Sequence, residues 1–222
     1  MKRIALARLS ALLEEHHASV PAPISRDPFQ LILWEQVAYL AKDDVRAKAF
    51  KELKDRIGLS PATISKAPLS TLAAVARTGG PIAVKERAQR MKRSAELAPT
   101  LQDLPSLPLE EARKRLANFP MIGKPGADKV LMMAGLFDAF ALESNGLRVL
   151  LRVGVAKEGK DYSASYRAVM DAMKDELPST RNERIALHER LRQHGLNVCK
   201  RTKPRCETCS VRSYCAFGPR TS

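Results

Sequence analysis

The chain has 222 residues, of which 45% are hydrophobic and 28% are charged. This composition indicates a soluble globular protein of one or two domains and excludes disorder as the main state. The apolar stretches are also shorter than the about 18 residues that a membrane span needs. Lys and Arg number 38 against 24 Asp and Glu, a formal net charge of +14. Such an excess predicts a polyanionic partner, either nucleic acid or an acidic membrane surface.

The N-terminus and the aromatic content narrow these possibilities. Lys2 and Arg3 are basic, but no continuous apolar core or small-residue cleavage site follows them. The segment is therefore not a signal peptide, and we expect a cytoplasmic protein, associated with the nucleoid if bacterial. Aromatic residues make up only 5% of the chain, which favours phosphate contacts on duplex DNA over a stacking surface for single strands. A basic surface without a polyanionic partner is the alternative.

The pattern is helical nearly throughout, and no pair of segments alternates as paired strands do. Gly79, Gly80 and Pro81 end one helical segment. Pro178 separates the last two helical segments, and Ser179 or Thr180 can cap the final helix. In chain order we expect helices over about 31–40, 70–76, 82–97, 109–118, 162–177 and 181–194. The sequence therefore predicts an all-α protein built from many short helices.

All four cysteines lie near the C-terminus, at Cys199, Cys206, Cys209 and Cys215. Two disulfides fit poorly with a cytosolic chain that has no other cysteine. Four thiolates at this close spacing bind either one zinc ion or an iron–sulfur cluster. Zinc ribbons usually offer two C-x2-C pairs, whereas this sequence has only one. The unequal spacing therefore favours a [4Fe–4S] cluster, and zinc is the alternative.

This cysteine segment resembles the iron–sulfur loop of endonuclease III and its relatives, the DNA glycosylases of the helix-hairpin-helix superfamily. The resemblance lies in the cysteine spacing, in the basic run between the first two cysteines, and in the preceding His194-Gly195. It implies that the four cysteines ligate one [4Fe–4S] cluster. It also implies that the basic residues of the run face DNA phosphates, solvated surface charges being the alternative: Lys200, Arg201, Lys203 and Arg205.

A second match, over residues 116–131, is similar to the helix-hairpin-helix of the same family, in which a Leu-Pro-Gly-hydrophobic-Gly turn joins two helices. Backbone N–H groups at such a turn form an anion site for a phosphate, and we expect Gly123 to take the positive φ of the turn. Met121 stands where the family has its first glycine. A helical corner without DNA contact is the alternative. The DNA-binding residues implied are Met121, Ile122, Gly123, Lys124, Gly126 and Lys129.

The catalytic positions match the family in part. Relatives that also cleave the strand carry a lysine two residues after the second glycine of the hairpin, and Pro125 stands there instead. We therefore do not expect β-lyase activity. Glu143 matches the family's aspartate, which stabilises the cationic sugar or activates water; capping of the next helix is the alternative. Glu35, beside Trp34, is a second candidate, as a buried acid that protonates the leaving base; a solvated glutamate on the helix is the alternative.

The resemblance extends over roughly residues 28–216 and implies two helical domains that frame a DNA-binding cleft. We expect an N-terminal helical segment over 1–28 that packs with the cluster domain, a six-helix barrel domain with the hairpin over 29–137, and an iron–sulfur cluster domain over 138–222. The implied function is a monomeric, monofunctional DNA glycosylase of base excision repair that acts on double-stranded DNA. A non-catalytic DNA-binding or damage-sensing protein is the alternative.

Overall fold

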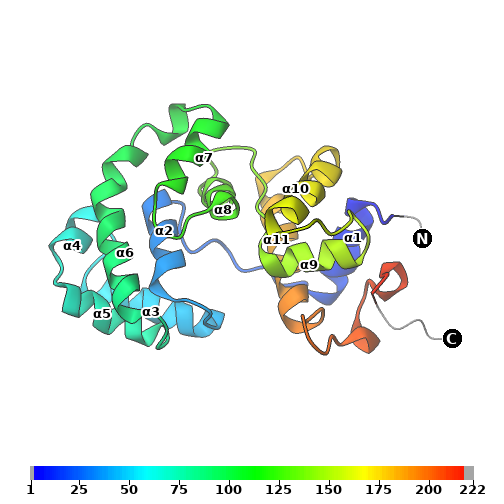
Figure 1. The fold of residues 1–222 in the computed structure, drawn as a ribbon, viewed down its shortest axis with the longest axis horizontal. Coiled ribbons are helices and arrows are strands. Elements are labelled where there is room, and N and C mark those ends of the chain that lie inside the picture. Colours follow the sequence, from blue (N-terminus) through cyan, green and yellow to red (C-terminus); the bar gives the residue numbers. More distant parts are fainter. Residues whose placement is uncertain (1–2, 218–222) are drawn as a thin grey trace. The chain divides into compact units, whose positions relative to one another are not determined.

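The computed structural model describes residues 3–217, and within that range every regular element is a helix (Figure 1). The predicted all-α class is therefore confirmed for the described residues. The chain divides into two compact units: unit 1 joins Met1–Ala22 to Phe140–Ser222, and unit 2 comprises Pro23–Ala139. Over residues 3–217, no helix combines the length and the apolar character needed to cross a membrane.

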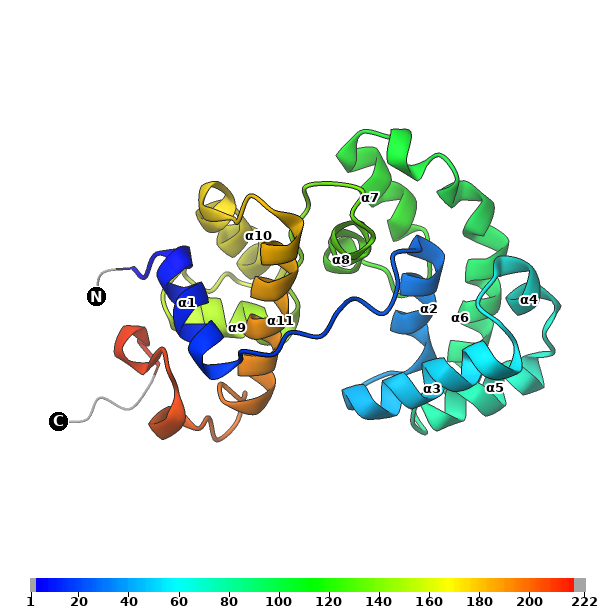
Figure 2. The same cartoon turned by 180° about the vertical axis from the view of Figure 1, so that it is seen from behind.

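Unit 2 is built from one continuous part of the chain, which Figure 2 shows from behind. Its helices are α2 (Pro28–Val37), α3 (Asp43–Arg56), α4 (Pro61–Lys66), α5 (Leu69–Thr78), α6 (Val84–Leu97), α7 (Leu109–Ala117) and α8 (Lys124–Ala134). The 3-10 turns η1 (Ala98–Leu101) and η2 (Leu104–Ser106) connect α6 to α7. The helices predicted at 70–76, 82–97 and 109–118 are confirmed as α5, α6 and α7. Helix α3 escaped prediction because it is mostly polar, with only three buried apolar residues.

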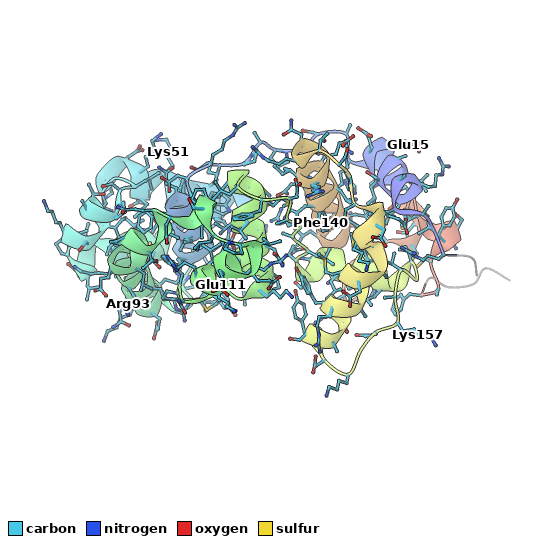
Figure 3. The ribbon with its side chains drawn as sticks, turned by 90° about the horizontal axis from the view of Figure 1, so that it is seen from above. Glu15, Lys51, Arg93, Glu111, Phe140 and Lys157 are labelled. Atoms are coloured by element: carbon cyan, nitrogen blue, oxygen red, sulfur yellow. The ribbon has the colours of Figure 1, made fainter. Side chains whose placement is uncertain are left out.

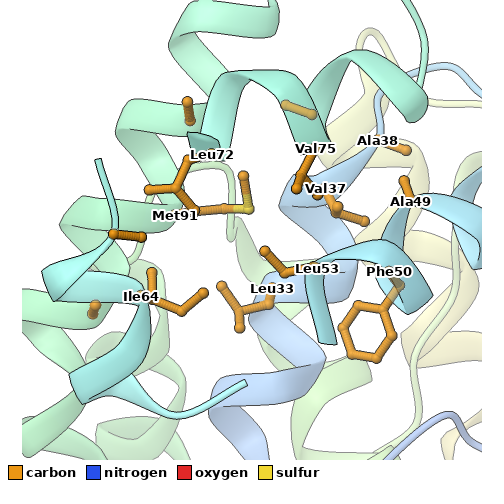
Figure 4. Close-up of a cluster of buried hydrophobic side chains, with 14 of the residues drawn as sticks. Leu33, Val37, Ala38, Ala49, Phe50, Leu53, Ile64, Leu72, Val75 and Met91 are labelled. Carbon is orange, nitrogen blue, oxygen red and sulfur yellow. The ribbon is translucent and has the colours of Figure 1, made fainter. Parts of the chain in front are cut away.

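The core of unit 2 surrounds α2. Leu33 and Val37 of this helix are fully buried, and six of its ten residues are buried, as expected for a helix that other helices enclose. Figure 4 shows the side chains that pack around them, among them Ala49, Phe50, Leu53, Ile64, Leu72, Val75 and Met91. Charged side chains such as Lys51, Arg93 and Glu111 project from the outer surface (Figure 3). The partition of apolar and charged residues thus follows the ordinary hydrophobic pattern.

Helix α2 ends earlier than the sequence predicts. Its last residue is Val37, and the exposed Leu40 has a left-handed backbone with a φ of 50°. The cause is a tertiary contact: the buried Arg87 of α6 donates from Nη1 to the carbonyl oxygen of Val37, at 2.7 Å. The same guanidinium also donates to the carbonyl of Ile82, at 2.9 Å. One buried cation therefore satisfies a carbonyl at the end of α2 and a carbonyl of the segment that leads into α6.

Unit 1 combines helices from both ends of the chain (Figure 1). They are α1 (Leu6–His16), α9 (Ser144–Arg152), α10 (Tyr162–Met173) and α11 (Arg181–Asn197), with the 3-10 turns η3 (Lys174–Glu176), η4 (Cys206–Thr208) and η5 (Arg212–Tyr214). Thr180 caps α11 in a capping box with Glu183, so one of the two predicted caps is confirmed. Leu9 and Leu13 of α1 are fully buried. An ion pair between Glu14 and Arg190 attaches α1 to α11.

Helices α9 and α11 cross in close contact, and glycines permit the approach. A Cβ atom at Gly195 would lie 2.5 Å from the carbonyl oxygen of Asn145. A Cβ atom at Gly146 would lie 3.2 Å from the Cβ of Leu191. Since real Cβ atoms do not approach backbone this closely, only glycine fits at position 195 without moving a helix. The crossing places the start of α9 against the end of α11, next to the cysteine segment.

We expect Gly195→Ala to destabilise unit 1, because its methyl group would overlap the backbone of Asn145; overpacking of this kind costs about 1–3 kcal/mol. Thermal denaturation followed by circular dichroism measures the loss. Gly126→Ala is the control, because a Cβ there meets Ile122 at an ordinary 3.5 Å and should leave the melting temperature unchanged or slightly raised. Equal melting temperatures for Gly195→Ala and the wild type would contradict this packing.

Candidate functional site

The hairpin predicted from the sequence joins α7 to α8 in unit 2. Its left-handed residue is Met121, with a φ of 68°, whereas Gly123 has a φ of −85°. The predicted positive φ at Gly123 is therefore wrong. The left-handed turn falls at the position where the family has its first glycine, although a side chain makes this conformation more costly. The side chain of Met121 is 53% exposed.

Helix α8 begins without a side-chain cap. Its N-cap is Gly123, and Pro125 in the first turn has no N–H group to satisfy. Gly123 and Lys124 are exposed, and a Cβ on Gly123 would come no closer than 3.9 Å to Pro125. Gly126 is half-buried, and Ile122 is buried beneath the turn. An anion can therefore approach the N–H groups at the positive end of this helix.

Buried polar contacts brace the hairpin from within unit 2. Gln36 of α2 donates to the carbonyl of Pro120 at 2.9 Å and to the hydroxyl of Ser94 at 2.8 Å. Arg113 of α7 pairs with the buried Asp128 of α8, with 2.6 Å between Nε and Oδ1. The first set of contacts ties α2 to α6 and to the turn, and the second joins α7 to α8, so the turn and its flanking helices are held in a defined shape.

Lys129 and Glu35 form an ion pair, with 2.8 Å between Nζ and Oε1. Arg46 lies on the other side of the carboxylate, 4.0 Å from Oε2, and the Glu35 side chain is 27% exposed. The structure therefore differs from the expectation of a buried, isolated acid beside Trp34. Lys129 was expected to face DNA; its amine pairs with Glu35 of α2, and its side chain is 24% exposed.

Glu143 is the N-cap of α9 in unit 1. Its Oε1 accepts hydrogen bonds from the backbone N–H groups of Asn145 (2.9 Å) and Gly146 (3.0 Å), and Oε2 accepts from Nδ2 of Asn145 (2.9 Å). The predicted alternative role, helix capping, is thus observed. The carboxylate is half-buried. Burial, together with the negative charge of Glu143, raises the pKa of the Tyr162 hydroxyl.

Two arginines of α9 connect this carboxylate to the cysteine segment. Arg148 donates from Nη2 to Oδ1 of Asn145 (2.8 Å) and from Nε to the carbonyl of Cys199 (2.9 Å). Arg152 donates to the Sγ atom of Cys199 at 3.3 Å. Burial lowers the pKa of Arg148. The only sequence signal for these two roles is the i, i+4 spacing, which places both guanidinium groups on one face of the helix.

The four cysteines are all half-buried, form no disulfide and line one small cavity in unit 1. Burial raises the pKa of the Cys209 thiol, and the neighbouring cysteines add to this, while a hydrogen bond from the Val211 N–H acts in the opposite direction. Crowded thiolates repel one another, so a bound cation is needed to keep them ionised together. Within residues 3–217, no group of three or more His, Cys, Asp or Glu side chains converges on one metal position.

His194 adjoins the cysteines from α11. It is fully buried, with Nε2 3.3 Å from the Sγ atom of Cys209 and Nδ1 3.2 Å from Nε2 of His17. Burial, together with the nearby His17 and His16, lowers the pKa of His194 to about 4. The imidazole is therefore neutral near pH 7. The sequence singled out this residue only as part of a motif.

The basic run forms the loop between the first two cysteines. Its basic residues are, in chain order, Lys200, Arg201, Lys203 and Arg205. Lys200 is half-buried, and the other three are exposed. Lys203 has a left-handed backbone with a φ of 51°, and the N–H of Arg205 closes the loop on the carbonyl of Val198 at 2.9 Å. Unit 1 thus brings Glu143, this loop and the cysteines together, while the hairpin and Glu35 belong to unit 2.

We expect Glu143→Ala to lower the free energy of unfolding by about 1 kcal/mol, because the N–H groups at the start of α9 lose their cap. Urea denaturation measures this value. Glu158→Ala removes a fully solvated carboxylate of the same unit and should have no effect. The capping role would be wrong if both variants unfolded like the wild type.

No family model matches the chain. It is 26% identical to an endonuclease III of Sulfolobus acidocaldarius over 194 residues, which are 87% of this chain and 83% of that protein. A solved endonuclease III–DNA complex has a TM-score of 0.74 at 20% identity and covers 95% of this chain and 94% of its own. A thermostable thymine-DNA glycosylase has a TM-score of 0.70 at 20% identity, with 96% and 94% covered. The chain is endonuclease III-like in sequence and has the fold of these helix-hairpin-helix glycosylases.

Proposed function

We propose that this protein is a monofunctional DNA glycosylase of base excision repair. It flips a damaged or mismatched base out of duplex DNA and hydrolyses the N-glycosidic bond. The observation that carries the proposal is Glu143, a half-buried carboxylate oriented at the start of α9 by three hydrogen bonds. It matches the family's catalytic aspartate in sequence. The similarity to endonuclease III over 87% of the chain supports the same class of activity.

Glu143 has a defined task in this reaction. As the base departs, positive charge develops on the sugar, and a fixed carboxylate stabilises that charge or accepts a proton from the attacking water. Glutamate is one methylene longer than the aspartate of the family. Its carboxylate turns back onto the N–H groups of Asn145 and Gly146, which offsets the added length.

Water is the proposed nucleophile, because the amine needed for a Schiff base is absent at Pro125. Lys124 is the adjacent residue, and consecutive helix positions point about 100° apart. The amine of Lys129 is engaged by Glu35 at 2.8 Å. Strand cleavage at abasic sites should therefore be weak.

Duplex DNA is the proposed partner, bound by a monomer. The uncapped start of α8 would receive one phosphate, and the exposed basic residues Arg201, Lys203 and Arg205 would receive others. Leu40 is 78% exposed on a tight turn, which suits an apolar side chain that fills the space left by a flipped base. Because its substrate is chromosomal DNA, the proposed location is the cytoplasm, at the nucleoid if the protein is bacterial.

The proposed cofactor is one [4Fe–4S] cluster held by the four cysteines. The thiols surround one cavity without converging on a single ion position. Four thiolates are the ligand set that a [4Fe–4S] cluster takes, so Cys199, Cys206, Cys209 and Cys215 would hold it. When bound, the cluster would cross-link the four cysteines of the C-terminal segment and supply the positive charge that keeps their thiolates ionised.

A second candidate function is a DNA-binding or damage-sensing protein without catalysis. It is favoured by one observation: both carboxylate oxygens of Glu143 are already occupied by hydrogen bonds at the start of α9. A carboxylate used only as a cap would give the same geometry.

The activity test is base release from duplexes that carry varied lesions and mismatches, with and without alkali. We expect the wild type to release the base and leave an abasic site, so that the strand breaks only after alkali. Borohydride should trap little covalent protein–DNA complex. The rate of base release should fall by about 100-fold or more in Glu143→Gln. Duplex affinity should stay unchanged in this variant, and Glu158→Gln should match the wild type. Wild-type base release by Glu143→Gln would refute the assigned role. The non-catalytic candidate would be favoured if the wild type bound duplexes and released no base.

The cofactor test is metal analysis after anaerobic purification. We expect a brown protein with about four irons per chain, because four thiolates ligate one cubane cluster. Cys206→Ser should lose most of the iron, whereas Met132→Ser, at a buried position of unit 2, should keep it if the protein folds. A colourless protein with one zinc ion would show that the zinc alternative is correct.

A further inference from the structure

A chain of hydrogen bonds in unit 1 connects the N-terminal helix to the third cysteine. Nε2 of His17, at the end of α1, lies 3.2 Å from Nδ1 of His194, and Nε2 of His194 lies 3.3 Å from the Sγ atom of Cys209. His194 has no solvent exposure. The glycosylase chemistry proposed above uses neither histidine.

The chemistry of the imidazole ring sets the direction of these hydrogen bonds. A neutral imidazole has one N–H donor and one acceptor nitrogen. A thiolate at Cys209 can only accept, so the proton of His194 must be on Nε2. Nδ1 of His194 is then the acceptor, and His17 must donate from its own Nε2. His17 thereby fixes the tautomer of His194.

We propose that His17 and His194 form a relay that donates a hydrogen bond to the Cys209 thiolate and makes α1 part of the metal centre. The proposal rests on the cluster proposed above. Both histidines are positioning residues, because neither binds the metal. A hydrogen bond to a ligand sulfur withdraws charge from it, which strengthens retention of the cluster and raises its reduction potential.

The backbone of His194 reinforces this role. Its carbonyl oxygen accepts from the N–H groups of Val198 (2.9 Å) and Cys199 (2.7 Å). The same residue therefore holds the first cysteine through its backbone and the third through its side chain. Gly195, which follows it, lies at the close crossing with α9. His194 is thus held in position by contacts within the chain.

The position of His17 depends on the docking of α1. Leu13 is buried, and Glu14 pairs with Arg190 of α11. The N–H of His17, the C-cap of α1, makes the last helical hydrogen bond of α1, to the carbonyl of Leu13 at 2.8 Å. His16 is exposed, and its ring contacts that of His194 edge-on, with 5.9 Å between centroids. It is therefore a matched control.

The test compares full-length wild type, His194→Leu, His194→Gln, His17→Leu and His16→Leu after identical anaerobic purification. Iron release to a ferrous chelator and the midpoint potential in voltammetry are measured, with thermal melts to verify folding. We expect His194→Leu to release iron about 10-fold faster and to have a more negative potential. His17→Leu should change in the same direction by less. His194→Gln, which keeps an N–H donor, should recover part of the loss, and His16→Leu should match the wild type.

The outcomes separate this relay from the earlier proposals. Loaded His194→Leu and His17→Leu proteins with wild-type release rates and potentials would overturn the relay alone. If His194→Leu does not fold, His17→Leu decides, because its half-buried ring lies at the edge of the unit. Iron-loaded wild type without base release would overturn the glycosylase and leave the relay standing. Wild type without iron would overturn both the cluster and the relay.

Discussion

The close crossing of α9 and α11 is the constraint on which the chemistry of unit 1 depends. Because position 195 has no side chain, the backbone of Asn145 reaches α11 directly. Arg148 then spans the remaining distance, with hydrogen bonds to Asn145 and to the carbonyl of Cys199. The orientation of Glu143 and the start of the cysteine loop are therefore set by one packing contact, and a change at that contact reaches both.

In unit 2, contacts from neighbouring helices stabilise the hairpin between α7 and α8, whose residues do not favour a tight turn by themselves. Met121 takes the left-handed conformation that glycine adopts most easily. The buried Gln36 hydrogen-bonds to the turn at Pro120, and the buried pair of Arg113 and Asp128 joins the flanking helices. These contacts keep the shape of the hairpin although a glycine is missing. The Met121 side chain consequently lies at the surface of the hairpin, where it is 53% exposed.

The formal net charge of +14 does not distinguish basic side chains that hold the fold together from those that are exposed. Arg87, Arg148 and Arg152 each donate to backbone carbonyl groups and hold segments of chain in place. Lys129 is paired within its own unit, which leaves the cysteine loop with three exposed basic side chains. The exposed basic residues are therefore fewer than the composition suggests, and three of them lie in this loop.

The sequence by itself determined the features that depend on neighbouring residues. The all-α class, α5, α6 and α7, the Thr180 cap and the gathering of four cysteines all follow from local spacing, because helix periodicity and loop length act over a few residues. Only the tertiary structure decided the early end of α2, the pairing of Glu35 with Lys129 and the contact between His17 and His194. These contacts join residues far apart in the chain. Which distant residues meet is decided by packing of helix faces, and a sequence pattern records which face is apolar but not which partner covers it.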